Sequence, residues 1–198
     1  MELEIKGVRV RVSFLFAGLI ALYLILMPGA ESAFFLLAIT LHETGHLLVL
    51  AAFGKPPAAV ELCPFGIRIT RRGAIMPPLR ELAALAAGPL ANLLSAALFF
   101  LASSAAGLGE LVLAARINLL VAAFNLIPAG SLDGGNMLRC LLERAFLPRT
   151  ARAVGIAVGC AFLLPLLAVG AVLLVCSPHR PSLLVTALYL AVTLLKDT

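Results

Sequence analysis

The sequence predicts an all-α polytopic membrane protein with six transmembrane helices and a small cytoplasmic β-hairpin between the second and third helices. The chain has 198 residues, of which 62% are hydrophobic and 13% charged, and its mean hydropathy of +1.09 lies outside the range of soluble domains. The apolar residues form long runs without charges, and each run is a candidate bilayer span. The basic residues gather in every second connection between these runs. These observations favour a membrane protein over a soluble domain.

Six apolar runs account for most of the chain. We interpret the first run as a retained helix, because it has no small-residue cleavage site at its end and another run follows it directly. The last run is short for a hydrocarbon core about 30 Å thick. The expected spans are Val12 to Met27, Ala33 to Phe53, Leu82 to Leu108, Leu111 to Ile127, Ala153 to Cys176 and Ser182 to Leu195.

The distribution of positive charge predicts the orientation of these spans. All but two of the 15 basic residues, Arg116 and Arg180, precede the first run or follow the second, fourth or sixth run. Cytoplasmic loops carry such an excess of Lys and Arg, so both termini are expected in the cytoplasm. The net charge of +5 is therefore attributed to topology anchors, and no nucleic-acid partner is expected.

The connection from Gly54 to Pro78 has the pattern of a β-hairpin. Apolar and polar residues alternate on both sides of the turn-forming segment Pro64-Phe65-Gly66, and alternation with a period of two is typical of a strand. A plain cytoplasmic loop remains the alternative interpretation. The alternating apolar residues are Val60, Leu62, Phe65, Ile67 and Ile69.

The second run contains the H-E-x-x-H pattern of zinc metalloproteases. Residues four apart lie on one face of a helix, so His42 and His46 can both bind one zinc ion. Glu43 follows the first histidine and is expected to act as the general base on a zinc-bound water, whose pKa the metal lowers to about 7. Ionisable groups inside an apolar span are costly unless they are paired or bind a metal, which favours a metal site over two core histidines.

A catalytic zinc ion usually has three protein ligands, and Asp133 is the candidate for the third. It follows a segment in which Pro128 and Gly130 prevent a continuous helix, and an acidic residue on a broken segment at membrane depth is a functional candidate. His179 is expected on the opposite side of the membrane. A turn aspartate at the end of the fourth span remains the alternative for Asp133.

The combination of motifs resembles the site-2 protease family of intramembrane metalloproteases. These motifs are His42-Glu43-Thr44-Gly45-His46, Gly88-Pro89-Leu90-Ala91-Asn92, Asn125-Leu126-Ile127-Pro128 and Leu132-Asp133-Gly134-Gly135. The resemblance implies zinc ligation by His42, His46 and Asp133, catalysis by Glu43, and a place for Asn125 near the substrate backbone. Asn125 could equally satisfy backbone groups that the break at Pro128 leaves open.

The resemblance also implies partners and a location. The compact layout and the Leu-Asp-Gly-Gly ending are most similar to the sporulation branch, whose substrate is a membrane-associated sigma-factor precursor. This branch implies inhibitory membrane partners and the bacterial cell membrane, in particular the mother-cell membrane around a forespore. A single domain over residues 1–198 is expected, without a PDZ or CBS domain. An anti-sigma factor or remnant signal peptide as substrate, and a zinc-binding membrane protein that is not an enzyme, remain alternatives.

Overall fold

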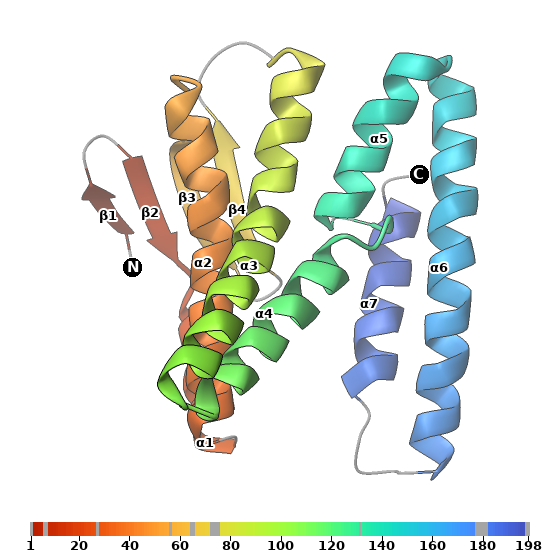
Figure 1. Ribbon diagram of the computed structural model, residues 1–198. Helices are drawn as coiled ribbons and strands as arrows, with labels where there is room; N and C mark the ends of the chain where they lie inside the picture. The colour runs from red at the N-terminus through yellow and green to blue at the C-terminus, as the bar shows by residue number, and fades with distance from the viewer. Residues whose placement is uncertain are drawn as a thin grey trace. The chain divides into compact units, whose positions relative to one another are not determined.

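The computed structural model describes residues 2–5, 8–26, 28–55, 57–63, 66–71, 76–130, 132–176 and 182–196 (Figure 1). The chain divides into two compact units, Met1–Ala122 and Ala123–Thr198, and each is described by itself. The expectation of one domain therefore stays a prediction.

Unit 1 contains four strands and the helices that carry the expected metal ligands. The helices are α1 (Phe14–Leu26), α2 (Ala30–Ala52), α3 (Pro78–Ala106) and α4 (Glu110–Asn125), the last of which ends in unit 2. Helix α3 begins with Pro78, which suits the first turn because its missing N–H would have no intrahelical partner there. It ends at Gly107, whose φ of 67° is the left-handed conformation that glycine adopts without strain.

A four-stranded sheet takes the place of the expected hairpin. Strands β3 (Pro57–Cys63) and β4 (Gly66–Arg71) pair antiparallel between α2 and α3, and their turn lies outside the described residues. Strands β1 (Glu2–Ile5) and β2 (Val8–Val12) extend the sheet in the order β1-β2-β3-β4, with β2 parallel to β3. The description of the chain as all-α with a lone hairpin is thus too simple, because the short alternation before the first apolar run also forms strands.

Helices α2 and α3 pack closely because small residues line their contact. A Cβ atom added to Gly45 would lie 2.5 Å from the backbone oxygen of Ala87 and 2.7 Å from the Cβ of Ala91, so only glycine allows this approach. Near the other end of the pair, the Arg80 guanidinium lies 5.6 Å from the centre of the Phe53 ring. The close crossing brings α3 onto the face of α2 that bears the histidines.

Unit 2 contains α5 (Asp133–Ala145), α6 (Pro148–Cys176) and α7 (Ser182–Lys196). Between α4 and α5 the chain is not helical, as Pro128 and the glycines predict, and Gly130 has a φ of 56°. Helices α6 and α7 approach closely where Gly159 faces Leu194 and Gly170 faces Leu184. The apolar core of the unit is centred on Ala129, Leu163 and Leu190.

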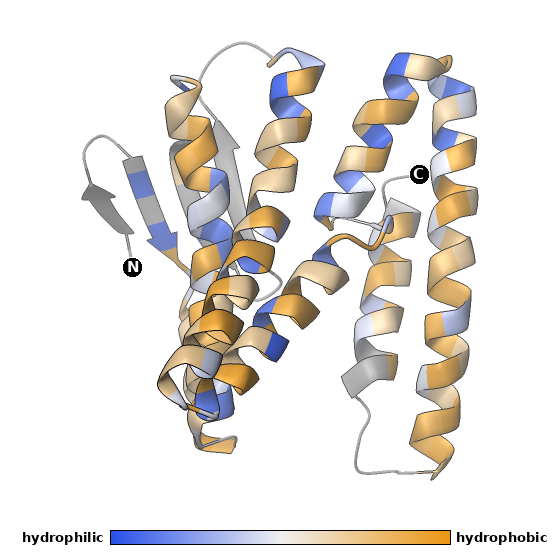
Figure 2. Cartoon of the chain, in the orientation of Figure 1, coloured by the Kyte–Doolittle hydropathy of each residue, from blue (hydrophilic) through white to orange (hydrophobic). Residues whose placement is uncertain are grey.

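Among the described residues, three helices are long and apolar enough to cross a membrane: α2, α3 and α6. Figure 2 shows hydrophilic residues at the N-terminal end of α6 and mostly hydrophobic residues along the remainder. At 1.5 Å per residue, the 29 residues of α6 extend about 43 Å, more than a hydrocarbon core of about 30 Å. Helices α1, α4 and α7 coincide with expected spans but are shorter than α2, α3 and α6. Six spans and the orientation of the termini therefore stay predictions.

Candidate metal centre

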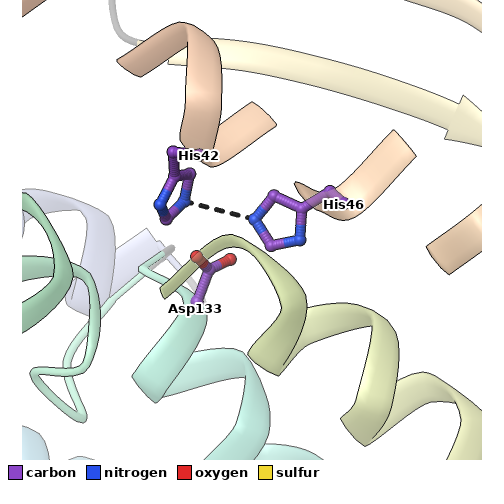
Figure 3. A group of neighbouring side chains, drawn as sticks. All are labelled: His42, His46 and Asp133. Atoms are coloured by element: carbon purple, nitrogen blue, oxygen red, sulfur yellow. Dashed lines mark hydrogen bonds between the residues drawn. The ribbon is translucent and has the colours of Figure 1, made fainter. Parts of the chain in front are cut away.

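The histidine pair lies in the middle of α2, with the two rings facing one another. The Nε2 atoms of His42 and His46 are 3.2 Å apart, and the ring centres are 4.9 Å apart in an edge-to-face arrangement (Figure 3). Two imidazole ligands on a tetrahedral zinc ion, each with a Zn–N distance of about 2.0–2.1 Å, place their nitrogen atoms about 3.3 Å apart. The spacing of the two Nε2 atoms therefore matches one shared metal ion.

The second nitrogen of His46 carries the proton. Its Nδ1 atom lies 2.7 Å from the backbone oxygen of Ala84 on α3. A carbonyl oxygen only accepts hydrogen bonds, so Nδ1–H must donate, and in the neutral ring Nε2 then bears the lone pair. A metal-ligating histidine usually holds its other nitrogen in this way, which orients the ring and raises the basicity of the ligating nitrogen.

His42 is held in the same manner by a side chain. Its Nδ1 atom lies 2.7 Å from Oδ1 of Asn92, which is also on α3. The amide nitrogen of Asn92 donates to the backbone oxygen of Ala38 and to Oδ1 of Asn118, each at 2.8 Å. Both asparagines are 0% exposed and His42 is 5% exposed. Every hydrogen of the Asn92 amide group is thus used, and its oxygen is left to accept from His42.

Gly88 leaves room for a metal ion beside the two rings. A Cβ atom at this position would lie 2.7 Å from Nε2 of His42 and still closer to Nε2 of His46. Such an atom would press on both imidazole rings and fill the space beside their Nε2 atoms. The space beside Gly88 and the lone pairs on Nε2 of His42 and His46 are compatible with a zinc ion, for which imidazole is a suitable ligand.

The other three expected site residues are Glu43, Asn125 and Asp133. Glu43 is half-buried on α2, directly after His42. Asn125 ends α4, and Asp133 is the first residue of α5; both are half-buried. No sequence pattern predicts a role for Gly88, Asn92 or Asn118. Gly88 and Asn92 belong to the motif Gly88-Pro89-Leu90-Ala91-Asn92, whereas Asn118 belongs to none of the motifs.

These features define a protein that has, in the part of the chain that the structure describes, three helices long and apolar enough to cross a membrane, the first of which carries a histidine pair that fits a metal ion. Residues 105–166 match the family model described as Peptidase family M50. The fold is similar to that of the site-2 protease from Methanocaldococcus jannaschii, with a TM-score of 0.70 and 22% identity over 99% of this chain and 94% of that one.

Two proteins of known sequence are also similar to part of the chain. Zinc metalloprotease MJ0392 of Methanocaldococcus jannaschii is 29% identical over 119 residues, which is 55% of this chain and 33% of that protein. The candidate zinc metalloprotease Rip3 of Mycobacterium tuberculosis is 35% identical over 125 residues, which is 59% of this chain and 32% of that protein. The chain thus spans about a third of the length of these relatives.

Proposed function

We propose that the protein is an intramembrane zinc metalloendopeptidase of the site-2 protease type. The observation that carries this proposal is the histidine pair on α2. Its two Nε2 atoms have the spacing of zinc ligands, and both Nδ1 atoms are held by acceptors on α3. The similarity to zinc metalloproteases supports the choice of metal and of reaction class.

In this proposal His42, His46 and Asp133 hold the zinc ion, and each offers one ligand atom (Figure 3). Two imidazoles and one carboxylate are a ligand set of hydrolytic zinc enzymes, which keep a fourth position open. Bound zinc supplies polarisation of the scissile carbonyl and a nucleophile available near neutral pH. Glu43 takes the proton from the attacking water and passes it to the leaving amine. The amide of Asn125 binds the substrate backbone near the cleaved bond.

The substrate must present an extended backbone to these groups. A transmembrane helix uses its carbonyl groups in its own hydrogen bonds, so local unwinding has to precede attack. The excess of basic residues in alternate connections supports a cytoplasmic side for the sheet and the C-terminal end of α2, so cleavage is proposed near that face. Reporter fusions to either end of the chain would test the orientation, and mapping the cut by mass spectrometry would test the position.

Replacing Glu43 by glutamine tests the proposed reaction. Because Glu43 acts on the substrate water without binding the metal, Glu43→Gln should lower the cleavage rate by at least about 100-fold while zinc remains bound in a 1:1 ratio. Zinc content by elemental analysis and cleavage of a membrane-embedded substrate are measured on the same preparation. Full cleavage by the variant would exclude Glu43 as the base, and wild-type protein with zinc but without protease activity would favour a zinc-binding protein that is not an enzyme.

The substrate is proposed to be a membrane-associated sigma-factor precursor. The layout expected from the sequence and the Leu-Asp-Gly-Gly ending resemble stage IV sporulation protein FB. On this resemblance we propose a location in the cell membrane of a sporulating bacterium and control by membrane partners. Co-expression with a sigma precursor, an anti-sigma factor or a remnant signal peptide distinguishes the substrates. Cleavage of only the second or third would reject the sporulation assignment.

A further inference from the structure

Two buried asparagines connect the metal site to a helix that carries no metal ligand. We propose that Asn92 and Asn118 form a positioning relay, in which Asn118 on α4 orients Asn92 on α3 and Asn92 keeps the proton of His42 on Nδ1. The lone pair of His42 is thereby kept on Nε2, where the metal binds. The proposal rests on the proposed function in one respect, the assignment of His42 as a metal ligand.

Two backbone carbonyl groups determine the orientation of the relay. The amide nitrogen of Asn118 donates to the backbone oxygen of Ala114 at 2.9 Å, so its side-chain oxygen faces Asn92. The amide nitrogen of Asn92 donates to that oxygen and to the backbone oxygen of Ala38. Since neither backbone oxygen can donate, the oxygen of Asn92 must point to His42.

Reversing the Asn92 amide group would be costly at both of its donated bonds. Its oxygen would then face the backbone oxygen of Ala38 and the side-chain oxygen of Asn118, at contacts that are now 2.8 Å long. Both asparagines are fully buried, so water is not at hand to relieve such a contact. The backbone oxygen of Ala38 and the side-chain oxygen of Asn118 therefore each hold the Asn92 amide group in the same orientation.

The orientation matters because it excludes the tautomer that cannot bind metal. A reversed Asn92 would present its N–H groups to His42, and Nδ1 would have to accept. The ring proton would then sit on Nε2 and occupy the ligand position. Asn92 contacts the proposed metal ligand His42 directly, whereas Asn118 contacts Asn92. Helix α4 would thus influence metal binding through α3.

The relay is tested by zinc affinity and by the tautomer of His42 in the metal-free protein. Asn92→Leu removes the acceptor of Nδ1 and should weaken zinc binding about 10- to 100-fold, whereas Asn118→Leu should weaken it about tenfold. Asn92→Asp loses both donated bonds and should lower stability, yet it keeps an acceptor for Nδ1 and should therefore keep the ring proton of His42 on Nδ1. Affinity is measured by competition with a chelating dye, and the tautomer by ¹⁵N NMR of labelled histidine. Both leucine variants should shift His42 toward the Nε2–H form.

Ser103→Ala is the matched control, because Ser103 is a buried polar residue on the same helix as Asn92 and should leave both readouts unchanged. Alanine versions of the two leucine variants, which add no bulk, are measured beside them.

A merely structural role predicts that Asn92→Asp shifts the His42 tautomer as far as Asn92→Leu does, since aspartate also loses both donated bonds. That result, or an unchanged tautomer in both leucine variants, would overturn the relay. Wild-type protein that binds no zinc would reject the proposed function, while the tautomer measurement would still decide the relay.

Discussion

At the scale of single residues, the metal site depends as much on a missing side chain as on the ligands. His42 and His46 could bind one ion from any helix, because residues four apart share a face. In this protein a second helix, α3, covers the pair, and Gly88 is the residue of α3 that lies against the two Nε2 atoms. Any other residue at position 88 would place a carbon atom close to both nitrogens.

Gly88→Ala is therefore expected to abolish zinc binding without unfolding the protein. The added methyl group would push both imidazole rings out of position, whereas alanine is favoured over glycine inside a helix by about 1 kcal/mol. Elemental analysis for zinc and the helical circular dichroism signal are compared with those of Gly18→Ala, because a Cβ at Gly18 has nothing within 4 Å. A Gly88→Ala variant with full zinc content would show that the ion binds elsewhere.

At the scale of elements, the non-helical segment before α5 positions Asp133. Gly134 follows the aspartate, and a Cβ at this position would lie 2.7 Å from the backbone oxygen of Ile127 and closer still to that of Leu126. The backbone of residues 126–127 thus rests directly on the first turn of α5. Leu132, which precedes the helix, is extended, and the N–H of Asn136 donates to its backbone oxygen at 2.9 Å.

Gly134→Ala should move the beginning of α5 and lower both stability and zinc affinity. Crowding against two backbone oxygen atoms cannot be relieved by turning a side chain, and overpacking of this kind costs about 1–3 kcal/mol. The free energy of unfolding in detergent and the zinc affinity are measured together. Gly109→Ala is the control, since a Cβ there has open space around it. An unchanged zinc affinity in a destabilised Gly134→Ala variant would argue against Asp133 as a ligand.

At the scale of the whole molecule, the sheet has an edge strand to which we expect an unwound substrate to add. Among the described strands β1 and β4 lie at the edges, and β4 belongs to the connection that joins α2 to α3. An extended peptide can add to such an edge through backbone hydrogen bonds. Strand β3 lies between β2 and β4, so the expected hairpin has one available edge and not two.

Proline substitutions along β4 test whether the substrate adds to this edge. In an antiparallel pair, alternate residues point their N–H groups away from the partner strand, so proline at these positions removes a donor for an added strand and leaves the β3–β4 bonds intact. The rate of substrate cleavage should therefore decrease when proline replaces every second residue of β4, one at a time, and the zinc content should not change. The same substitutions in β1 serve as the comparison. Uniform wild-type rates along β4 would reject the idea.

Much of this protein is determined by local patterns in the sequence. Long apolar runs specify membrane helices, the spacing of His42 and His46 specifies a shared face, and Pro128 with the following glycines ends α4 before Asp133. Each of these depends on residues close together in the chain, where helix geometry and backbone sterics decide the outcome. Tertiary structure alone decided the rest. Gly88, Asn92 and Asn118 acquire their roles from helices that meet across 26 to 50 residues of sequence. Strand β2 pairs with β3, more than 40 residues away, and β1 pairs with β2. A hydrogen bond or a close approach between distant segments produces no periodic pattern in either segment. Such contacts are therefore recognised from the packed structure and not from the sequence.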